Sequence, residues 1–205
     1  HGSSPETVTN PEYSKGIVEA GCHKHWDVLT FQTYSWDNFD PEEVREPLER
    51  IRELYAENSS YGKDRPIFTT LGYPSSVEEG WITSSEEKQA KMLARILLTD
   101  QFSGVNVTLW YNHQDDIYAM ATWGFYGLYK SQDEGSKILE PKPAYVAAKA
   151  FSSLLQGFHF LSRLNAGGSE EYVLEFADAN AAESRYAAWT RSGTPVTITA
   201  PLKKG

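Results

Sequence analysis

The sequence is short of several features that would assign it to particular protein classes. Cys22 is the single cysteine in 205 residues, so no intrachain disulfide can form. No apolar stretch approaches the roughly 18 residues of a transmembrane helix, and we expect no membrane partner. Lysine and arginine total 19 against 28 aspartates and glutamates, which gives a net charge of −9. This acidic balance, without a long basic run, argues against a nucleic-acid partner.

Aromatic residues, in contrast, are abundant. The chain contains 9 Phe, 6 Trp and 12 Tyr, and 40% of its residues are hydrophobic. This composition excludes a disordered chain. The opening residues 1–4, His-Gly-Ser-Ser, are typical of a purification-tag remnant. We therefore leave them out of the fold prediction and expect the natural sequence to begin near Pro5.

Three short apolar runs predict buried strands in the first part of the chain. They cover residues 27–33, 66–71 and 105–111, and each is rich in β-branched and aromatic residues. Helical patterns separate them. Such an alternation indicates an α/β fold in which parallel strands are covered by helices.

The predicted helices have recognisable starts. Asp40 and Pro41 begin the first helix, which then carries one apolar stripe, formed by Val44, Leu48, Ile51 and Tyr55. A capping box of Ser84 and Glu87 starts the second helix, which continues to about Phe102. After a long loop over 112–142, a third helix begins at Pro143.

The pattern changes from about Phe160 onward. Alternating apolar and polar runs at 172–176, 186–190 and 196–199 are separated by turn residues. These runs predict antiparallel strands of a second unit.

Five fragments of the sequence occur in a familiar order, at 27–34, 66–74, 88–90, 107–111 and 142–145. In this order they resemble the C-terminal part of a retaining glycoside hydrolase of clan A, especially the β-xylosidases and α-iduronidases. The resemblance covers roughly residues 12–200. It implies that the three strands are the sixth to eighth of a (β/α)₈ barrel, followed by strands of an appended β-sandwich.

The expected domain organisation follows from the strand and helix patterns together with the family resemblance. Residues 5–160 form a partial (β/α) barrel-type unit with parallel strands, and residues 161–205 form an antiparallel, β-sandwich-like tail. Barrel strands need neighbours at both edges. We therefore expect a homo-oligomer or a complementary chain to cover them, or else the N-terminal stretch and the strands after Phe160 to fold back over the open side.

The resemblance also implies where a sugar would bind. Active residues of such barrels lie at the carboxyl ends of the strands, and here these ends are rich in aromatic residues. Stacking of a sugar on the Trp110 ring is one expected contact; packing of that ring under the 112–142 loop is the alternative. The candidate carbohydrate-binding residues are Gln32, Tyr34, Trp110, Asn112, Asp115 and Asp116.

Catalytic carboxylates are missing from the expected positions. Retaining glycosidases use two carboxyl groups about 5 Å apart. The resemblance places the family's nucleophilic glutamate at Thr70, and its acid/base glutamate ends a strand that this chain does not include. Glu78, Glu79, Asp115 and Asp116 lie near the expected rim, but a solvated loop acid is the favoured interpretation of each. No catalytic residue is therefore predicted.

No cofactor or metal is expected. His23, His25 and His113 with Asp115 do not have the spacing of a known metal site. Asn58 begins an Asn-Ser-Ser glycosylation pattern, which is relevant because the resemblance favours a secreted or extracytoplasmic location.

Three functions remain open from the sequence alone. The first is a catalytically degenerate, glycoside-hydrolase-like chain that binds an oligosaccharide. The second is one piece of an active split or processed retaining glycosidase. The third is a structural or interaction protein without a ligand.

Overall fold

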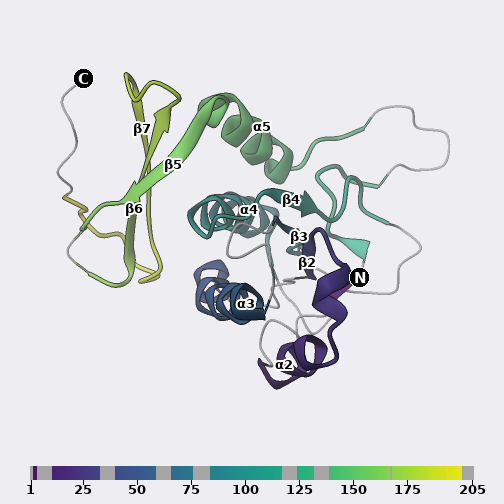
Figure 1. Ribbon diagram of the computed structural model, residues 1–205. Coiled ribbons are helices and arrows are strands. Elements are labelled where there is room, and N and C mark those ends of the chain that lie inside the picture. Colours follow the sequence, from purple (N-terminus) through teal and green to yellow (C-terminus); the bar gives the residue numbers. More distant parts are fainter. Residues whose placement is uncertain are drawn as a thin grey trace. The chain divides into compact units, whose positions relative to one another are not determined.

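The computed structural model describes residues 2–3, 11–32, 40–58, 66–75, 84–116, 124–131, 139–166 and 168–199. The chain divides into two compact units, His1–Lys149 and Ala150–Gly205. Within the described residues, each unit has one β-sheet (Figure 1).

The sheet of the first unit is parallel throughout. Its strands follow one another in sequence order, as β1 (Gly2–Ser3), β2 (Leu29–Gln32), β3 (Ile67–Leu71) and β4 (Val107–Trp110). The last three strands fall within the three predicted ranges. The predicted α/β class and parallel strand order are therefore confirmed, whereas closure into a barrel stays a prediction.

Strand β1 lies within the four residues that resemble a tag remnant. Gly2 pairs with Thr30 and Ser3 with Phe31, so these residues extend the sheet. Backbone N–H and C=O groups form the ladder whatever the side chain. A Gly-Ser pair therefore gives no strand signal in the sequence.

The helices of the first unit are α2 (Pro11–Glu19), α3 (Arg45–Asn58), α4 (Glu86–Phe102) and the beginning of α5 (Pro143–Leu155). Two 3-10 turns, η1 (Cys22–His25) and η2 (Pro41–Val44), precede β2 and α3. Helices α3 and α4 lie on the same side of the sheet (Figure 1).

Two helix starts differ in detail from their predictions. The helix predicted from Asp40 begins as the 3-10 turn η2 and becomes α-helical at Arg45. The capping box of Ser84 and Glu87 is wrong by one residue, because Ser85 is the N-cap and its hydroxyl accepts a hydrogen bond from the Lys88 backbone N–H at 3.1 Å. Ser84 is buried instead.

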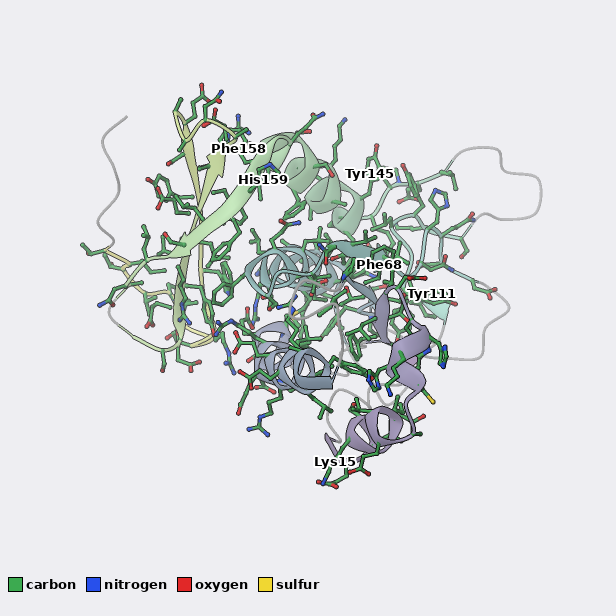
Figure 2. The ribbon with its side chains drawn as sticks, in the orientation of Figure 1. Lys15, Phe68, Tyr111, Tyr145, Phe158 and His159 are labelled. Atoms are coloured by element: carbon green, nitrogen blue, oxygen red, sulfur yellow. The ribbon has the colours of Figure 1, made fainter. Side chains whose placement is uncertain are left out.

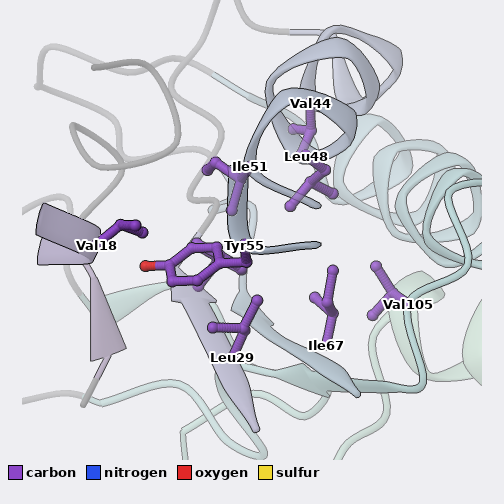
Figure 3. Close-up of a cluster of buried hydrophobic side chains, with 9 residues drawn as sticks. Val18, Leu29, Val44, Leu48, Ile51, Tyr55, Ile67 and Val105 are labelled. Atoms are coloured by element: carbon purple, nitrogen blue, oxygen red, sulfur yellow. The ribbon is translucent and has the colours of Figure 1, made fainter. Parts of the chain in front are cut away.

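The predicted apolar stripe forms the core of the first unit. Val44 and the α3 residues Leu48, Ile51 and Tyr55 are all buried, with no more than 5% of any of them exposed. Figure 3 shows these side chains facing Leu29 of β2 and Ile67 of β3. Helix α3 is therefore held on the sheet by apolar burial.

The two faces of the sheet differ in burial. Residues that point toward the helices, Leu29, Phe31, Ile67 and Thr69, are buried. Alternate residues belong to the opposite face, which we call the open face. On this face of β4, Val107 is 37% exposed and Leu109 is 50% exposed.

The sheet of the second unit is antiparallel, which confirms the strand arrangement predicted for this part of the chain. Its strands are β5 (Phe158–Arg163), β6 (Glu171–Asp178) and β7 (Ser184–Thr190), in that order. The runs at 172–176 and 186–190 lie in β6 and β7. The run at 196–199 forms no strand, and β5 takes the third place.

The division between the units falls within α5, before the boundary near residue 160 that the sequence predicts. The guanidinium of Arg185 donates to the carbonyl oxygen of Leu154 and lies 3.9 Å from the centre of the Phe158 ring. The end of α5 therefore belongs with the antiparallel sheet. Among the described residues this unit has one sheet, and a β-sandwich stays a prediction.

Truncation of Leu48 tests the importance of the α3 core. Leu48 is fully buried, so Leu48→Ala should lower the free energy of unfolding by about 2–5 kcal/mol through lost burial and a residual cavity. Denaturant titration measures this loss. Glu53→Ala, at an exposed position of the same helix, should change stability by less than about 0.5 kcal/mol. Equal effects of the two substitutions would contradict this account of the core.

Candidate functional site

Gln32, Thr70 and Leu109 form one row across the open face. Gln32 is the last residue of β2 and pairs with Thr70, which in turn pairs with Leu109 of β4. In parallel strands, paired residues lie on the same face. Two candidate residues from different parts of the sequence are therefore brought together near the carboxyl ends of the strands.

The two polar side chains of this row are at least partly exposed. Gln32 is exposed and Thr70 is partly exposed. Neither the Gln32 amide nor the Thr70 hydroxyl has a hydrogen-bond partner among the described residues. An amide and a hydroxyl together offer donors and acceptors suited to the hydroxyl groups of a sugar.

Tyr111 and Asn112 continue the site beyond β4. Tyr111 is 41% exposed and packs edge to face on Tyr126, with ring centres 5.7 Å apart. It lies past the carboxyl end of β4, away from α3 (Figure 2). The Asn112 Oδ1 accepts from the His113 N–H at 2.6 Å, while its Nδ2 has no acceptor within the described parts of the chain. One exposed aromatic ring and one amide donor thus adjoin the Gln32–Thr70 row.

Trp110 has a packing role. Its side chain packs against the buried cluster of Tyr73, Met92 and Ile96. Its indole Nε1 donates to the Tyr126 carbonyl oxygen at 3.1 Å. The ring is thus packed under the segment that follows β4, which is the second of the two expected arrangements, and Tyr111 is the more exposed aromatic residue at this edge.

Asp115 forms a buried ion pair instead of lying open at the rim. Its two carboxylate oxygens accept from the Lys142 Nζ at 3.0 and 3.1 Å, and Oδ1 also accepts from the Gly127 N–H at 2.7 Å. Lys142 is fully buried. Burial raises the pKa of Asp115 and lowers the pKa of Lys142, and the attraction between the two charges opposes both shifts.

The remaining residues singled out in the sequence have different outcomes. Asp116 is exposed, and its backbone N–H donates to the Gly124 carbonyl oxygen at 2.7 Å. Tyr34, Glu78 and Glu79 lie outside the described residues. Asn58 is the last residue of α3, and the two serines that complete its glycosylation pattern also lie outside the described residues.

A second buried acid lies on the helix-covered face of the sheet. Oδ2 of Asp100, near the end of α4, accepts from the hydroxyls of Thr69 on β3 at 2.7 Å and Thr108 on β4 at 2.6 Å. Burial raises the pKa of Asp100 to about 6. The hydroxyls favour the charged form, but no cation contacts the carboxyl among the described residues, so desolvation dominates.

Sequence reasoning missed the groups around Lys142. Ser75 follows β3, Gln89 lies in α4, and both are buried with Lys142 beside the Phe125 carbonyl oxygen. Lys142 belongs to a fragment that carried the family resemblance, but a lysine before a helix predicts an exposed charge. Its burial depends on Asp115, 27 residues earlier in the chain.

Metal-ligating and membrane-spanning features are absent from the described parts of the chain. No three His, Cys, Asp or Glu side chains come together there as metal ligands would. No described helix is long and apolar enough to cross a membrane. Cys22 is exposed.

Comparisons with known proteins gave structural matches only. No protein-family model and no curated protein matches the sequence. Two solved structures of a β-1,3-glucanosyltransferase from Rhizomucor miehei, one of them described as glycoside hydrolase family 17, are similar, each with a TM-score of 0.40. The first is an active-site mutant in complex with laminaritriose, at 16% identity, and the second is at 17%. Each match covers 63% of this chain and 55% of the enzyme, so the chain spans about half of that protein.

Asp100 should make stability depend on pH. Its folded-state pKa of about 6 lies above its ordinary value of 3.8, so the folded state holds the proton more tightly and stability falls as pH rises from about 4 to 6. This difference in pKa corresponds to about 3 kcal/mol. Asp100→Asn should remove this slope in denaturant titrations at several pH values. Asp27→Asn, at an exposed position, is the matched control, and parallel curves for wild type and Asp100→Asn would refute the assignment.

Proposed function

We propose that the chain is a glycosidase-like protein that binds an oligosaccharide without hydrolysing it. The observation that carries this proposal is the group of uncharged polar side chains at adjacent strand ends. Gln32, Thr70 and Asn112 each retain hydrogen-bonding groups without partners among the described residues, and Tyr111 is exposed beside them.

The chemistry of these groups fits a sugar better than a charged ligand. Amides and hydroxyls bind sugar hydroxyls through neutral hydrogen bonds, each contributing about 1 kcal/mol net. The exposed Tyr111 ring can stack on the apolar face of a pyranose, which adds on the order of 1 kcal/mol. Asp116 is a further proposed contact, whereas Asp115 is engaged by Lys142.

Hydrolysis is not proposed because the site has no suitable pair of carboxyl groups among the described residues. Thr70 occupies the position that the family resemblance assigns to the nucleophile. Its hydroxyl cannot take the part of a carboxylate without an activating base. Of the buried acids, Asp100 is held by two hydroxyls and Asp115 by Lys142.

Calorimetric titration with xylo- and cello-oligosaccharides tests binding. We expect dissociation constants of about 0.1–1 mM, which correspond to binding free energies of roughly 4–5.5 kcal/mol. Gln32→Ala and Tyr111→Ala should each weaken binding about 3- to 10-fold. Tyr13→Ala is the matched control, because Tyr13 is a 57% exposed tyrosine of α2. No saturable heat at about 10 mM sugar, or equal affinity of the Tyr111→Ala and Tyr13→Ala variants, would contradict the proposal.

Assays with aryl glycosides test the absence of catalysis. The wild-type chain should release no nitrophenol above background, because loss of either catalytic carboxyl group costs several orders of magnitude in rate. Thr70→Glu should remain inactive, since it supplies one carboxyl group of the two. Turnover that survives repurification and disappears in Asp116→Asn would show that the chain is an active hydrolase.

A further inference from the structure

The segment over residues 124–128 lies across the residues that follow β3 and β4. The Phe125 carbonyl oxygen accepts from the Ser75 N–H at 2.9 Å. The Tyr126 carbonyl oxygen accepts from the Asn112 N–H at 3.0 Å, and the Leu128 N–H donates back to the Asn112 carbonyl oxygen at 3.1 Å. Both the backbone N–H and the carbonyl oxygen of Asn112 are therefore hydrogen-bonded to this segment.

The close approach of this segment requires glycine at two positions. A Cβ at Gly72 would collide with the Tyr111 carbonyl oxygen and the Tyr126 ring. A Cβ at Gly127 would collide with the Asp115 backbone nitrogen. The segment 124–128 and the loops that follow β3 and β4 therefore contact one another through their backbone atoms.

Lys142 joins the parts of this arrangement through buried hydrogen bonds. Its Nζ donates to the Ser75 Oγ at 2.9 Å, to the Phe125 carbonyl oxygen at 3.3 Å and to both oxygens of Asp115. Gln89 adds a donor to the same Phe125 oxygen at 3.1 Å. The Asp115 carboxylate in turn accepts from the Gly127 N–H. One ammonium group thus connects the loop after β3, the loop after β4 and the segment 124–128.

We infer that Lys142 is a positioning residue of the proposed carbohydrate site. With Asp115 it holds the segment 124–128, and this segment fixes Tyr111 and Asn112 in place. The inference rests on the proposed function for its ligand, and on the described hydrogen bonds for its geometry.

Stability and positioning can be separated by substitution. A buried ion pair can often be replaced by apolar side chains of similar size with little loss of stability, whereas removal of one partner leaves a buried charge unpaired. An apolar pair cannot donate to the Phe125 carbonyl oxygen or accept from the Gly127 N–H. The double variant Lys142→Met, Asp115→Leu should therefore fold while the segment loses its hydrogen bonds to Lys142 and Asp115.

The experiment compares Lys142→Met, the double variant and Lys149→Met. Lys149 is an exposed lysine of α5, the helix that follows Lys142. For each variant we measure the melting temperature, the oligosaccharide affinity and the hydrogen exchange at the Asn112 and Leu128 amides. Lys142→Met should lose stability, and the double variant should recover most of it. The double variant should nevertheless bind at least about 5-fold more weakly and exchange both amides at least about 10-fold faster, while Lys149→Met matches wild type.

The outcomes distinguish this inference from the proposed function. Wild-type affinity and wild-type exchange in the double variant would overturn the inference and make the ion pair purely structural. If the wild-type protein binds no oligosaccharide, the proposed function fails, and amide exchange still decides whether Lys142 holds the segment. If Lys142→Met does not fold, the double variant supplies the comparison.

Discussion

The burial of the α3 stripe against β2 and β3 is the interaction on which the first unit depends. Val44, Leu48, Ile51 and Tyr55 cover the sheet residues Leu29 and Ile67. Because parallel strands do not pair through short hairpins, each strand reaches its neighbour through a helix that must be held to the sheet. Apolar burial provides that attachment, and it places the carboxyl ends of the strands at one edge.

Among the described residues, helices cover one face of the sheet, and the two faces therefore have different properties. Apolar residues and the Asp100 carboxyl lie on the helix-covered face. The open face carries Gln32, Thr70 and the exposed Leu109. The structural acid and the available polar groups are therefore separated by the alternation of side chains along each strand.

Beyond β4, a buried polar cluster lies next to the exposed residues of the proposed site. Lys142 and Asp115 are both buried, although both side chains are ionisable. Their burial is compensated by hydrogen bonds to Ser75, Phe125 and Gly127. The exposed Tyr111 is thus adjacent to a group of buried residues that are joined by hydrogen bonds.

The sequence by itself determined the α/β class, the three main strands and the inward stripe of α3, because these features follow from local periodicity and local turn chemistry. The tertiary structure alone decided the pairing of Gly2 and Ser3 with β2, the inward packing of Trp110 and the pairing of Lys142 with Asp115. Each of these depends on residues distant in sequence. A lone lysine, aspartate or tryptophan has the same local pattern whether it is exposed or buried, and only its partners in space determine which.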